Sequence, residues 1–177
     1  MAYPDYSKSS KSKLTRMDNM EKEIFIVEDS ADFRQIIRTV FAQFLPKYHI
    51  RSFMSVQELY KYMILQSDEN FKGRRPVLII LDLNIPSFGG LEILKILRQT
   101  PSNAVTVWET LPVIMLSSVA KQEDINACYK AGAASYFIKP LEIEGLKQLL
   151  IKICNYWVDD NILASVTVSK SLSHSNH

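Results

Sequence analysis

The chain has 177 residues, of which 47% are hydrophobic and 23% are charged, and its formal net charge is +2. These values are ordinary for a soluble protein of one globular domain, and so small a charge gives no argument for a nucleic-acid partner. No apolar run approaches the roughly 20 residues of a membrane span, and the first 20 residues have no apolar segment typical of a secretory signal. We therefore expect a cytoplasmic protein that does not bind membranes. We expect no disulfide framework, because Cys128 and Cys154 fall at apolar positions of predicted helices.

The composition divides the chain into three segments. Residues 1–20 are rich in Ser and Lys and poor in apolar residues, which is typical of a flexible tail. Residues 21–157 alternate short apolar runs with helical stripes, and we expect them to form the folded domain. Residues 158–177 form a C-terminal extension without a helix-turn-helix pattern, so we predict no output domain that binds DNA.

Five apolar runs in the folded domain are predicted to be strands, and a stripe of apolar residues at three- and four-residue spacing follows each of them. The runs are residues 23–27, 48–54, 77–81, 111–116 and 135–138, and the stripes are residues 33–45, 56–64, 91–97, 121–131 and 143–157. Pro46 ends the first helix. Ser55 and Glu58 form a capping-box pattern before the second, and Gly132 suits a left-handed cap after the fourth. This alternation predicts βαβ units, right-handed crossovers and a parallel sheet.

The central strand is the run of five apolar residues from Val77 to Leu81, which leads directly into Asp82. A run this short without polar alternation is typical of a strand that is covered on both faces. Asp82 then lies at the carboxyl end of the strand, which is the edge of an open α/β sheet where ligands bind. We predict that Asp82 is a nucleophile that accepts a phosphoryl group.

Polar side chains also follow three other predicted strands: Glu28 and Asp29 after the first, Ser117 after the fourth and Lys139 after the fifth. Because the carboxyl ends of parallel strands share one edge, we expect these groups to converge on Asp82. Two carboxylates about 4 Å apart repel by roughly 4 kcal/mol at an effective dielectric constant near 20. A hard divalent cation removes this repulsion.

We therefore predict a Mg²⁺ cofactor that is held by Asp29 and Asp82, with Glu28 often bound through a water molecule. The backbone carbonyl of Asn84 is a further candidate ligand, because the loop after the nucleophile must turn over the metal. Phosphoryl transfer needs positioning and charge stabilisation of the equatorial oxygens. Lys139 would supply a cation to one oxygen and Ser117 a hydrogen bond to another.

Each of these residues has a simpler explanation when it is considered alone. An Asp at a strand end is often a helix cap, a Glu-Asp pair before a helix commonly compensates the helix dipole, and a Lys before Pro is usually solvated. These explanations are independent and would all have to hold at four strand ends. The combination therefore favours a phosphoacceptor site.

The chain resembles the receiver domain of two-component response regulators, over about Glu23 to Trp157. The matching motifs are Ile26–Ser30, Leu81–Pro86, the helix start Gly90–Glu92, Pro112–Ser117, and Ala131–Ala133 leading to Lys139–Pro140. The resemblance implies a flavodoxin-like, doubly wound sheet of five parallel strands in the order 2-1-3-4-5. It also implies that a histidine kinase or a phosphotransfer protein phosphorylates Asp82 in a phosphorelay, and that the protein is not an enzyme beyond its own phosphorylation and dephosphorylation.

The resemblance further implies a cis peptide bond between Lys139 and Pro140. Tyr136 occupies the position of the switch aromatic of the family, whose rotation is linked to Ser117. An amphipathic strand residue with its hydroxyl in water is an equally good interpretation of Tyr136.

The sequence departs from the family pattern at a few places. Gly89 stands where many members have Asp, Ser117 replaces the commoner Thr, and Thr100–Thr110 is longer than in minimal receivers. This insertion and the end Asn155–Trp157 are similar to the small stand-alone regulators that partner bacterial phytochromes. We therefore predict a stand-alone receiver that signals through protein contacts, with a phytochrome-type sensor as the candidate kinase.

Two other functions remain as alternatives. A phosphatase of the haloacid dehalogenase type also uses a strand-end Asp and Mg²⁺, but it needs a second Asp where this chain has Asn84. A degenerate receiver that acts as a constitutive interaction module is the other, and the full acidic, hydroxyl and Lys set argues against it. The apolar residues Val158, Ile162, Leu163, Val166 and Val168 would either fold back on the last helix or form a homodimer contact.

Overall fold

A parallel sheet of five strands lies at the centre of the structure, a computed structural model that describes residues 22–68, 70–86, 89–101 and 108–160. The strands are β1 (Lys22–Val27), β2 (Ile50–Phe53), β3 (Arg75–Asp82), β4 (Val113–Ser117) and β5 (Ser135–Ile138). All neighbouring strands are parallel, and their order is β2-β1-β3-β4-β5. The predicted fold class and strand order are therefore confirmed.

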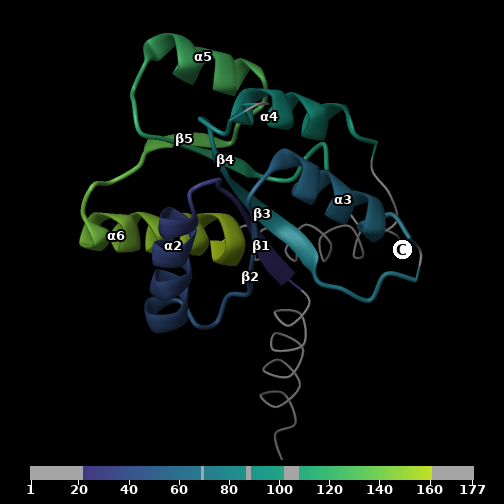
Figure 1. The fold of residues 1–177 in the computed structure, drawn as a ribbon, viewed down its shortest axis with the longest axis horizontal. Coiled ribbons are helices and arrows are strands. Elements are labelled where there is room, and N and C mark those ends of the chain that lie inside the picture. The colour runs from purple at the N-terminus through teal and green to yellow at the C-terminus, as the bar shows by residue number, and fades with distance from the viewer. Residues whose placement is uncertain (1–21, 69, 87–88, 102–107, 161–177) are drawn as a thin grey trace, which may run out of the picture.

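Helices cover both faces of the sheet (Figure 1). They are α2 (Ala31–Phe44), α3 (Val56–Gln66), α4 (Gly90–Gln99), α5 (Gln122–Lys130) and α6 (Ile143–Cys154), and a π-helical turn, η1 (Asn155–Asp160), continues α6. Side chains of α2, α6 and η1 pack on one face of the sheet. Side chains of α3, α4 and α5 pack on the other.

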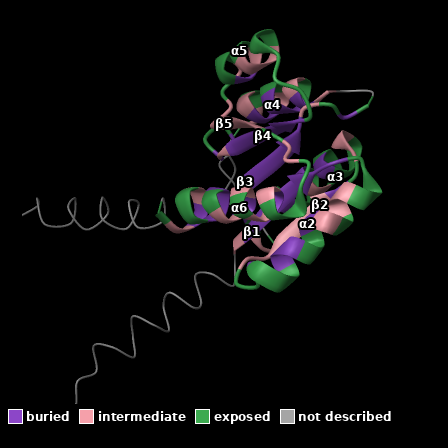
Figure 2. Ribbon diagram, turned by 90° about the vertical axis from the view of Figure 1, so that its left-hand side faces the viewer, coloured by how far each residue is buried: buried purple, intermediate pink, exposed green. Residues whose placement is uncertain are grey.

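The apolar strands form two cores because successive side chains point to opposite faces. In β3, Ile79 and Leu81 belong to the core under α3, α4 and α5, whereas Leu78 and Ile80 belong to the core under α2 and α6. Buried residues therefore run along the whole centre of the sheet (Figure 2). This double coverage explains why β3 is apolar until Asp82, the residue at its carboxyl end.

The predicted helix boundaries largely agree with the structure. Ser30 caps α2 through a hydrogen bond from the Phe33 amide to its hydroxyl, at 3.2 Å. The Ser55 hydroxyl accepts a hydrogen bond from the Glu58 amide, but the Glu58 carboxylate accepts from the amide of Met54 rather than from Ser55. Gly132 has φ +96°, as expected for a left-handed cap.

Trp108 belongs to the core, although the sequence places it in a long connection. Its side chain is 1% exposed, and its ring lies 6.5 Å from that of Phe25 in β1. Its carbonyl oxygen accepts a hydrogen bond from Nη1 of Arg98, at 3.1 Å. The end of the predicted insertion is therefore attached to the domain, while residues 102–107 lie outside the described part of the chain.

Trp108→Ala is expected to lower the free energy of unfolding by about 3–5 kcal/mol, because it leaves a large cavity in a close-packed core. Urea unfolding would measure the loss. Tyr60→Ala is the control, because Tyr60 is 53% exposed on α3 and should change stability by less than about 0.5 kcal/mol. Similar losses in both variants would show that Trp108 does not support the core.

The last helix extends past the predicted domain end at Trp157. Val158 is 4% exposed in the core under α2 and α6. One oxygen of Asp159 accepts hydrogen bonds from Nζ of Lys47, at 2.7 Å, and from the hydroxyl of Tyr48, at 2.8 Å. Of the two alternatives for the C-terminal apolar residues, folding back therefore holds for Val158, the first of them. Residues 162, 163, 166 and 168 lie outside the described residues, so the homodimer contact stays a prediction.

Cys128 and Cys154 are both buried and free. Burial raises the pKa of the Cys154 thiol to about 12. Among the described residues, no helix is both long and apolar enough to cross a bilayer.

Candidate functional site

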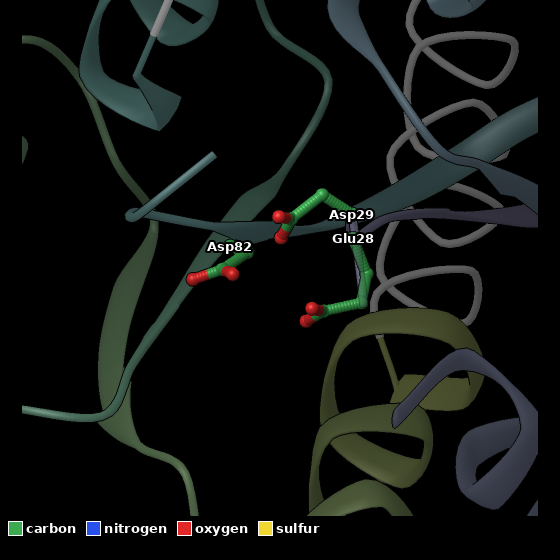
Figure 3. Close-up of side chains that lie close together, drawn as sticks. All are labelled: Glu28, Asp29 and Asp82. Atoms are coloured by element: carbon green, nitrogen blue, oxygen red, sulfur yellow. The ribbon is translucent and has the colours of Figure 1, made fainter. Parts of the chain in front are cut away.

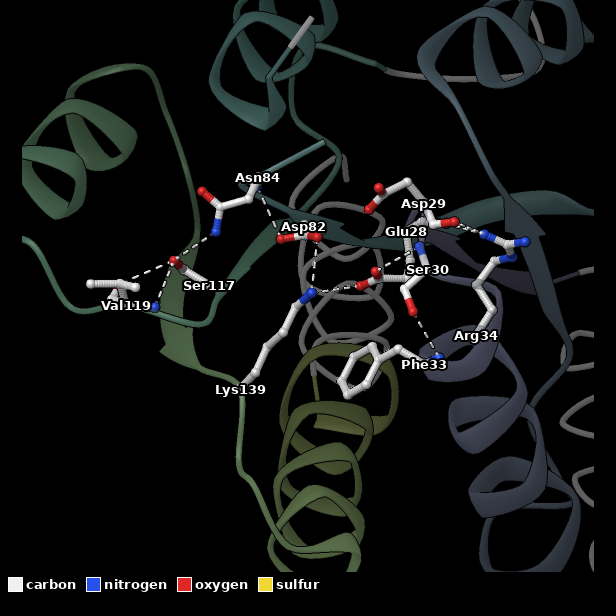
Figure 4. A network of polar contacts seen from close by, with 10 residues as sticks. All are labelled: Glu28, Asp29, Ser30, Phe33, Arg34, Asp82, Asn84, Ser117, Val119 and Lys139. Carbon is white, nitrogen blue, oxygen red and sulfur yellow. Dashed lines mark hydrogen bonds and ion pairs between the residues drawn. The ribbon is translucent and has the colours of Figure 1, made fainter. Parts of the chain in front are cut away.

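The carboxyl edge of the sheet brings together polar residues that end or directly follow four of the strands (Figure 4). Asp82 is the last residue of β3 and Ser117 the last of β4. Glu28 directly follows β1 and Lys139 directly follows β5. Glu28, Asp82 and Ser117 are buried, each less than 5% exposed.

Lys139 connects two of the buried carboxylates. Its Nζ lies 2.7 Å from Oε2 of Glu28 and 2.9 Å from Oδ2 of Asp82. It also lies 4.7 Å from the centre of the Phe33 ring, which is within reach of a cation–π interaction. One cation therefore balances two acids, and its position between them follows from the β3-β1 and β3-β4-β5 pairings of the sheet.

The charge states in this cluster follow from burial and from the shared amine. Burial lowers the pKa of the Lys139 amine, but its hydrogen bonds with Glu28 and Asp82 outweigh burial, so this pKa lies above its ordinary value. Burial raises the pKa of the Glu28 carboxyl, and the Lys139 amine opposes this change only in part. Lys139 therefore stays positively charged beside Asp82.

Glu28, Asp29 and Asp82 form an acidic cluster in which one carboxylate oxygen of each residue lies within 4.8 Å of the other two (Figure 3). Asp29 is exposed, whereas the other two residues are buried. Three carboxylates with one open side fit a hard divalent cation, which takes a few carboxylate oxygens and keeps water on its remaining positions. The residue set thus suits a hard divalent cation in charge and in ligand type.

The loop after β3 turns back toward the site through Asn84. The backbone amide of Asn84 donates a hydrogen bond to Oδ1 of Asp82, at 3.0 Å, and the side-chain amide of Asn84 donates to Oγ of Ser117, at 3.4 Å. The structure thus places the backbone of Asn84 beside Asp82. It also links the nucleophile candidate to the end of β4.

Two hydroxyl groups meet at the loop between β4 and α5. The Ser117 hydroxyl donates to the carbonyl oxygen of Val119, at 3.0 Å, and the Tyr136 hydroxyl donates to the same oxygen, at 2.9 Å. The Val119 amide in turn donates to Ser117, at 3.2 Å. Tyr136 therefore has a protein partner, and it shares this partner with Ser117.

The predicted cis peptide bond is wrong. The described residues contain no cis peptide bond, so the bond between Lys139 and Pro140 is trans. The trans form is the default for a bond that precedes proline, by about 0.5–1 kcal/mol. The Lys139 amine reaches both carboxylates from this trans backbone.

Sequence reasoning did not single out Arg34 or the contact of Phe33 with Lys139. Nη1 of Arg34 donates hydrogen bonds to the carbonyl oxygens of Glu28, at 2.7 Å, and Asp29, at 2.6 Å. The sequence does hold one signal for the Arg34 contacts, which is its position shortly after Glu28 and Asp29. An Arg in the first turns of a helix can reach the carbonyl oxygens of the loop that precedes the helix.

The family model for the response regulator receiver domain matches residues 24–151 of this chain. The chain belongs to this family. The match runs from within β1 to within α6 and includes every strand end described above. Receiver domains are the phosphoacceptor modules of two-component systems, and histidine kinases phosphorylate them. Neither the dehalogenase-type phosphatase nor the constitutive module is favoured by this match.

Two relatives illustrate the similarity in sequence. The KDP operon transcriptional regulatory protein KdpE of Escherichia coli is 34% identical over 127 residues, which are 72% of this chain and 48% of that protein. The receiver thus spans about half the length of this relative. Response regulator Rcp1 of Synechocystis is 25% identical over 142 residues, which are 80% of this chain and 92% of that protein.

Solved structures extend the comparison. The phosphorylated cyanobacterial phytochrome response regulator RcpA has a TM-score of 0.66 and 28% identity, and the match covers 78% of this chain and 94% of RcpA. The Mn²⁺-bound form of Rcp1 has a TM-score of 0.62 and 25% identity, and the match covers 77% of this chain and 94% of Rcp1. The receiver is therefore similar in sequence and in fold to phytochrome-partnered response regulators.

Proposed function

We propose that Asp82 is the phosphoacceptor of this receiver and that Lys139, Ser117 and the acidic cluster support the transfer. The observation that carries the proposal is the position of the Lys139 amine, which contacts Asp82 and Glu28 at once at the carboxyl edge of the sheet. A buried carboxylate that lies beside a fixed cation can act as a nucleophile.

In the proposed step, a carboxylate oxygen of Asp82 attacks the phosphorus atom of a phosphohistidine. The new oxygen–phosphorus bond forms as the nitrogen–phosphorus bond to the donor imidazole breaks, and the histidine side chain leaves. Lys139 then offers its charge to one phosphoryl oxygen.

Asp29 and Asp82 would hold Mg²⁺ through carboxylate oxygens, Asn84 through its backbone carbonyl and Glu28 through a water molecule. When bound, the metal offsets the charge of the acids and of the phosphoryl oxygens. The acidic cluster supports this assignment, as does the relative Rcp1, whose structure is of a Mn²⁺-bound form.

Ser117 and Tyr136 are proposed to report the phosphorylated state. The phosphoryl group adds about −1.5 to −2 charges beside Ser117. In the structure, the Ser117 and Tyr136 hydroxyls both donate to the carbonyl oxygen of Val119. When the Ser117 hydroxyl turns to donate to a phosphoryl oxygen, it gives up this hydrogen bond. The loop between β4 and α5 and the Tyr136 side chain are then free to change position together, which would alter a surface for protein partners.

The proposed phosphodonor is a histidine kinase of the phytochrome type, or a phosphotransfer protein that acts with one. Similarity to RcpA, which is a phytochrome response regulator, supports this class of donor. Phosphotransfer from each histidine kinase of the source organism would test it. A phytochrome-type kinase is expected to transfer fastest, and a faster transfer from another class would refute the assignment.

Treatment of the protein with acetyl phosphate tests the function directly. With Mg²⁺ present, intact mass spectrometry is expected to show the gain of one phosphoryl group, because the cation allows the acids and the phosphoryl oxygens to share one site. EDTA in place of Mg²⁺ should abolish the gain. A gain that persists in EDTA, or its absence with both Mg²⁺ and Mn²⁺, would contradict the proposal.

A further inference from the structure

Arg34 of α2 holds the loop that carries two of the three acids (Figure 4). A single nitrogen of its guanidinium group, Nη1, donates to the carbonyl oxygens of Glu28 and Asp29, at 2.7 and 2.6 Å. These distances lie at and just below the short end of the usual range for N–H···O hydrogen bonds, and the charge of the donor strengthens such bonds. We propose that Arg34 is a positioning residue, which sets the affinity of the acidic cluster for a divalent cation.

The short segment from Glu28 to Ser30 connects β1 to α2. The Glu28 amide donates to the carbonyl oxygen of Phe53, at 3.1 Å, and the Ser30 amide donates to the Glu28 carboxylate, at 3.1 Å. These bonds hold the two ends of the segment. Arg34 binds the carbonyl oxygen of Asp29, the residue between them.

Asp29 depends on its backbone more than the other two acids do. Glu28 and Asp82 are buried, and both accept hydrogen bonds from Lys139 through their carboxylates. The Asp29 side chain is exposed, and within the described residues no side chain donates a hydrogen bond to its carboxylate. Its distance from Asp82 is therefore set by the peptide that Arg34 holds.

Rotation of that peptide would move the Asp29 carboxylate away from the other two acids. Removal of a hydrogen-bond partner of a metal-ligating residue typically lowers metal affinity 10- to 100-fold. Arg34 acts on backbone oxygens rather than on the ligand oxygens themselves, so we expect an effect near the lower end, about tenfold. This inference rests on the proposed metal site.

The test compares Arg34→Met with Arg38→Met in the full chain. Arg38 lies one turn further along α2 and is exposed, so its substitution removes the same charge without touching the acidic loop. Electron paramagnetic resonance of free Mn²⁺ gives the dissociation constant without any phosphorylation. Arg34→Met is expected to bind Mn²⁺ about tenfold more weakly than the wild type, and Arg38→Met to bind within about twofold of it.

Two further measurements separate positioning from a general loss of structure. The rate of phosphorylation by acetyl phosphate should need about tenfold more Mg²⁺ for half-saturation in Arg34→Met, while the rate at saturating Mg²⁺ stays close to that of the wild type. Arg34→Lys keeps a cation with several N–H donors, so it should recover most of the Mn²⁺ affinity. If Arg34→Met does not fold, Arg34→Gln serves as the test variant, and it is expected to bind Mn²⁺ more weakly than both the wild type and Arg34→Lys.

Unchanged Mn²⁺ affinity in Arg34→Met would overturn the inference, as would an equal loss in Arg38→Met, which would point to charge alone. If the wild type binds Mn²⁺ and Arg34→Met does so more weakly, the inference holds even when acetyl phosphate modifies neither protein. That last result would refute the proposed function and leave the role of Arg34 intact.

Discussion

Asp82→Asn is expected to abolish the gain of a phosphoryl group from acetyl phosphate. The amide oxygen of Asn carries no charge, so it is a poor nucleophile and a weak metal ligand. The substitution preserves the size of the side chain, and its one oxygen can accept a hydrogen bond either from Lys139 or from the Asn84 amide, which contact different oxygens of Asp82. Lys139 also keeps its contact with Glu28. The fold should therefore survive, with a change in the free energy of unfolding of less than about 1.5 kcal/mol.

Intact mass after incubation with acetyl phosphate and Mg²⁺ measures the effect. Asp32→Asn is a matched control, because this substitution makes the same chemical change at an exposed position in the first turn of α2. It should be phosphorylated like the wild type. Equal phosphorylation of Asp82→Asn and the wild type would refute the nucleophile assignment.

Lys139→Met is expected to lower the free energy of unfolding by about 3–5 kcal/mol in the absence of metal, because it leaves two buried carboxylates without their partner. The Glu28 and Asp82 side chains are 3% and 4% exposed, so solvent compensates little for the lost amine. Mg²⁺ should restore part of the loss, since a cation in the acidic cluster again balances the two charges. The phosphorylation rate should also fall, because one phosphoryl oxygen loses its counter-charge.

Urea unfolding at neutral pH, with and without Mg²⁺, would measure both effects. Lys95→Met is the control, because Lys95 pairs with Glu92 on the surface, where both side chains are about half exposed. An exposed pair contributes at most about 1 kcal/mol. If both variants lost the same stability, or if Mg²⁺ did not help Lys139→Met, the shared amine would not have the role assigned to it.

Most of the candidate site could be predicted from the sequence because parallel strands place their carboxyl ends on one edge. Asp82, Ser117 and Lys139 each follow a short apolar run, and the register of the sheet brings these ends together. The predicted Mg²⁺ ligands followed from the same topology, since Glu28 and Asp29 come directly after β1, the strand beside β3. Hydrogen bonds such as that of Tyr136 to Val119 could not be predicted, because they depend on the path of a loop.

The sequence by itself determined the order of strands and helices, the double coverage of β3 and the residues at the strand ends, because periodic burial is written into the spacing of apolar residues. The tertiary structure alone decided that Trp108 enters the core, that Asp159 binds Lys47 and Tyr48, and that Arg34 holds the acidic loop. These features need contacts between segments that follow no local period, so only the folded chain brings their atoms together.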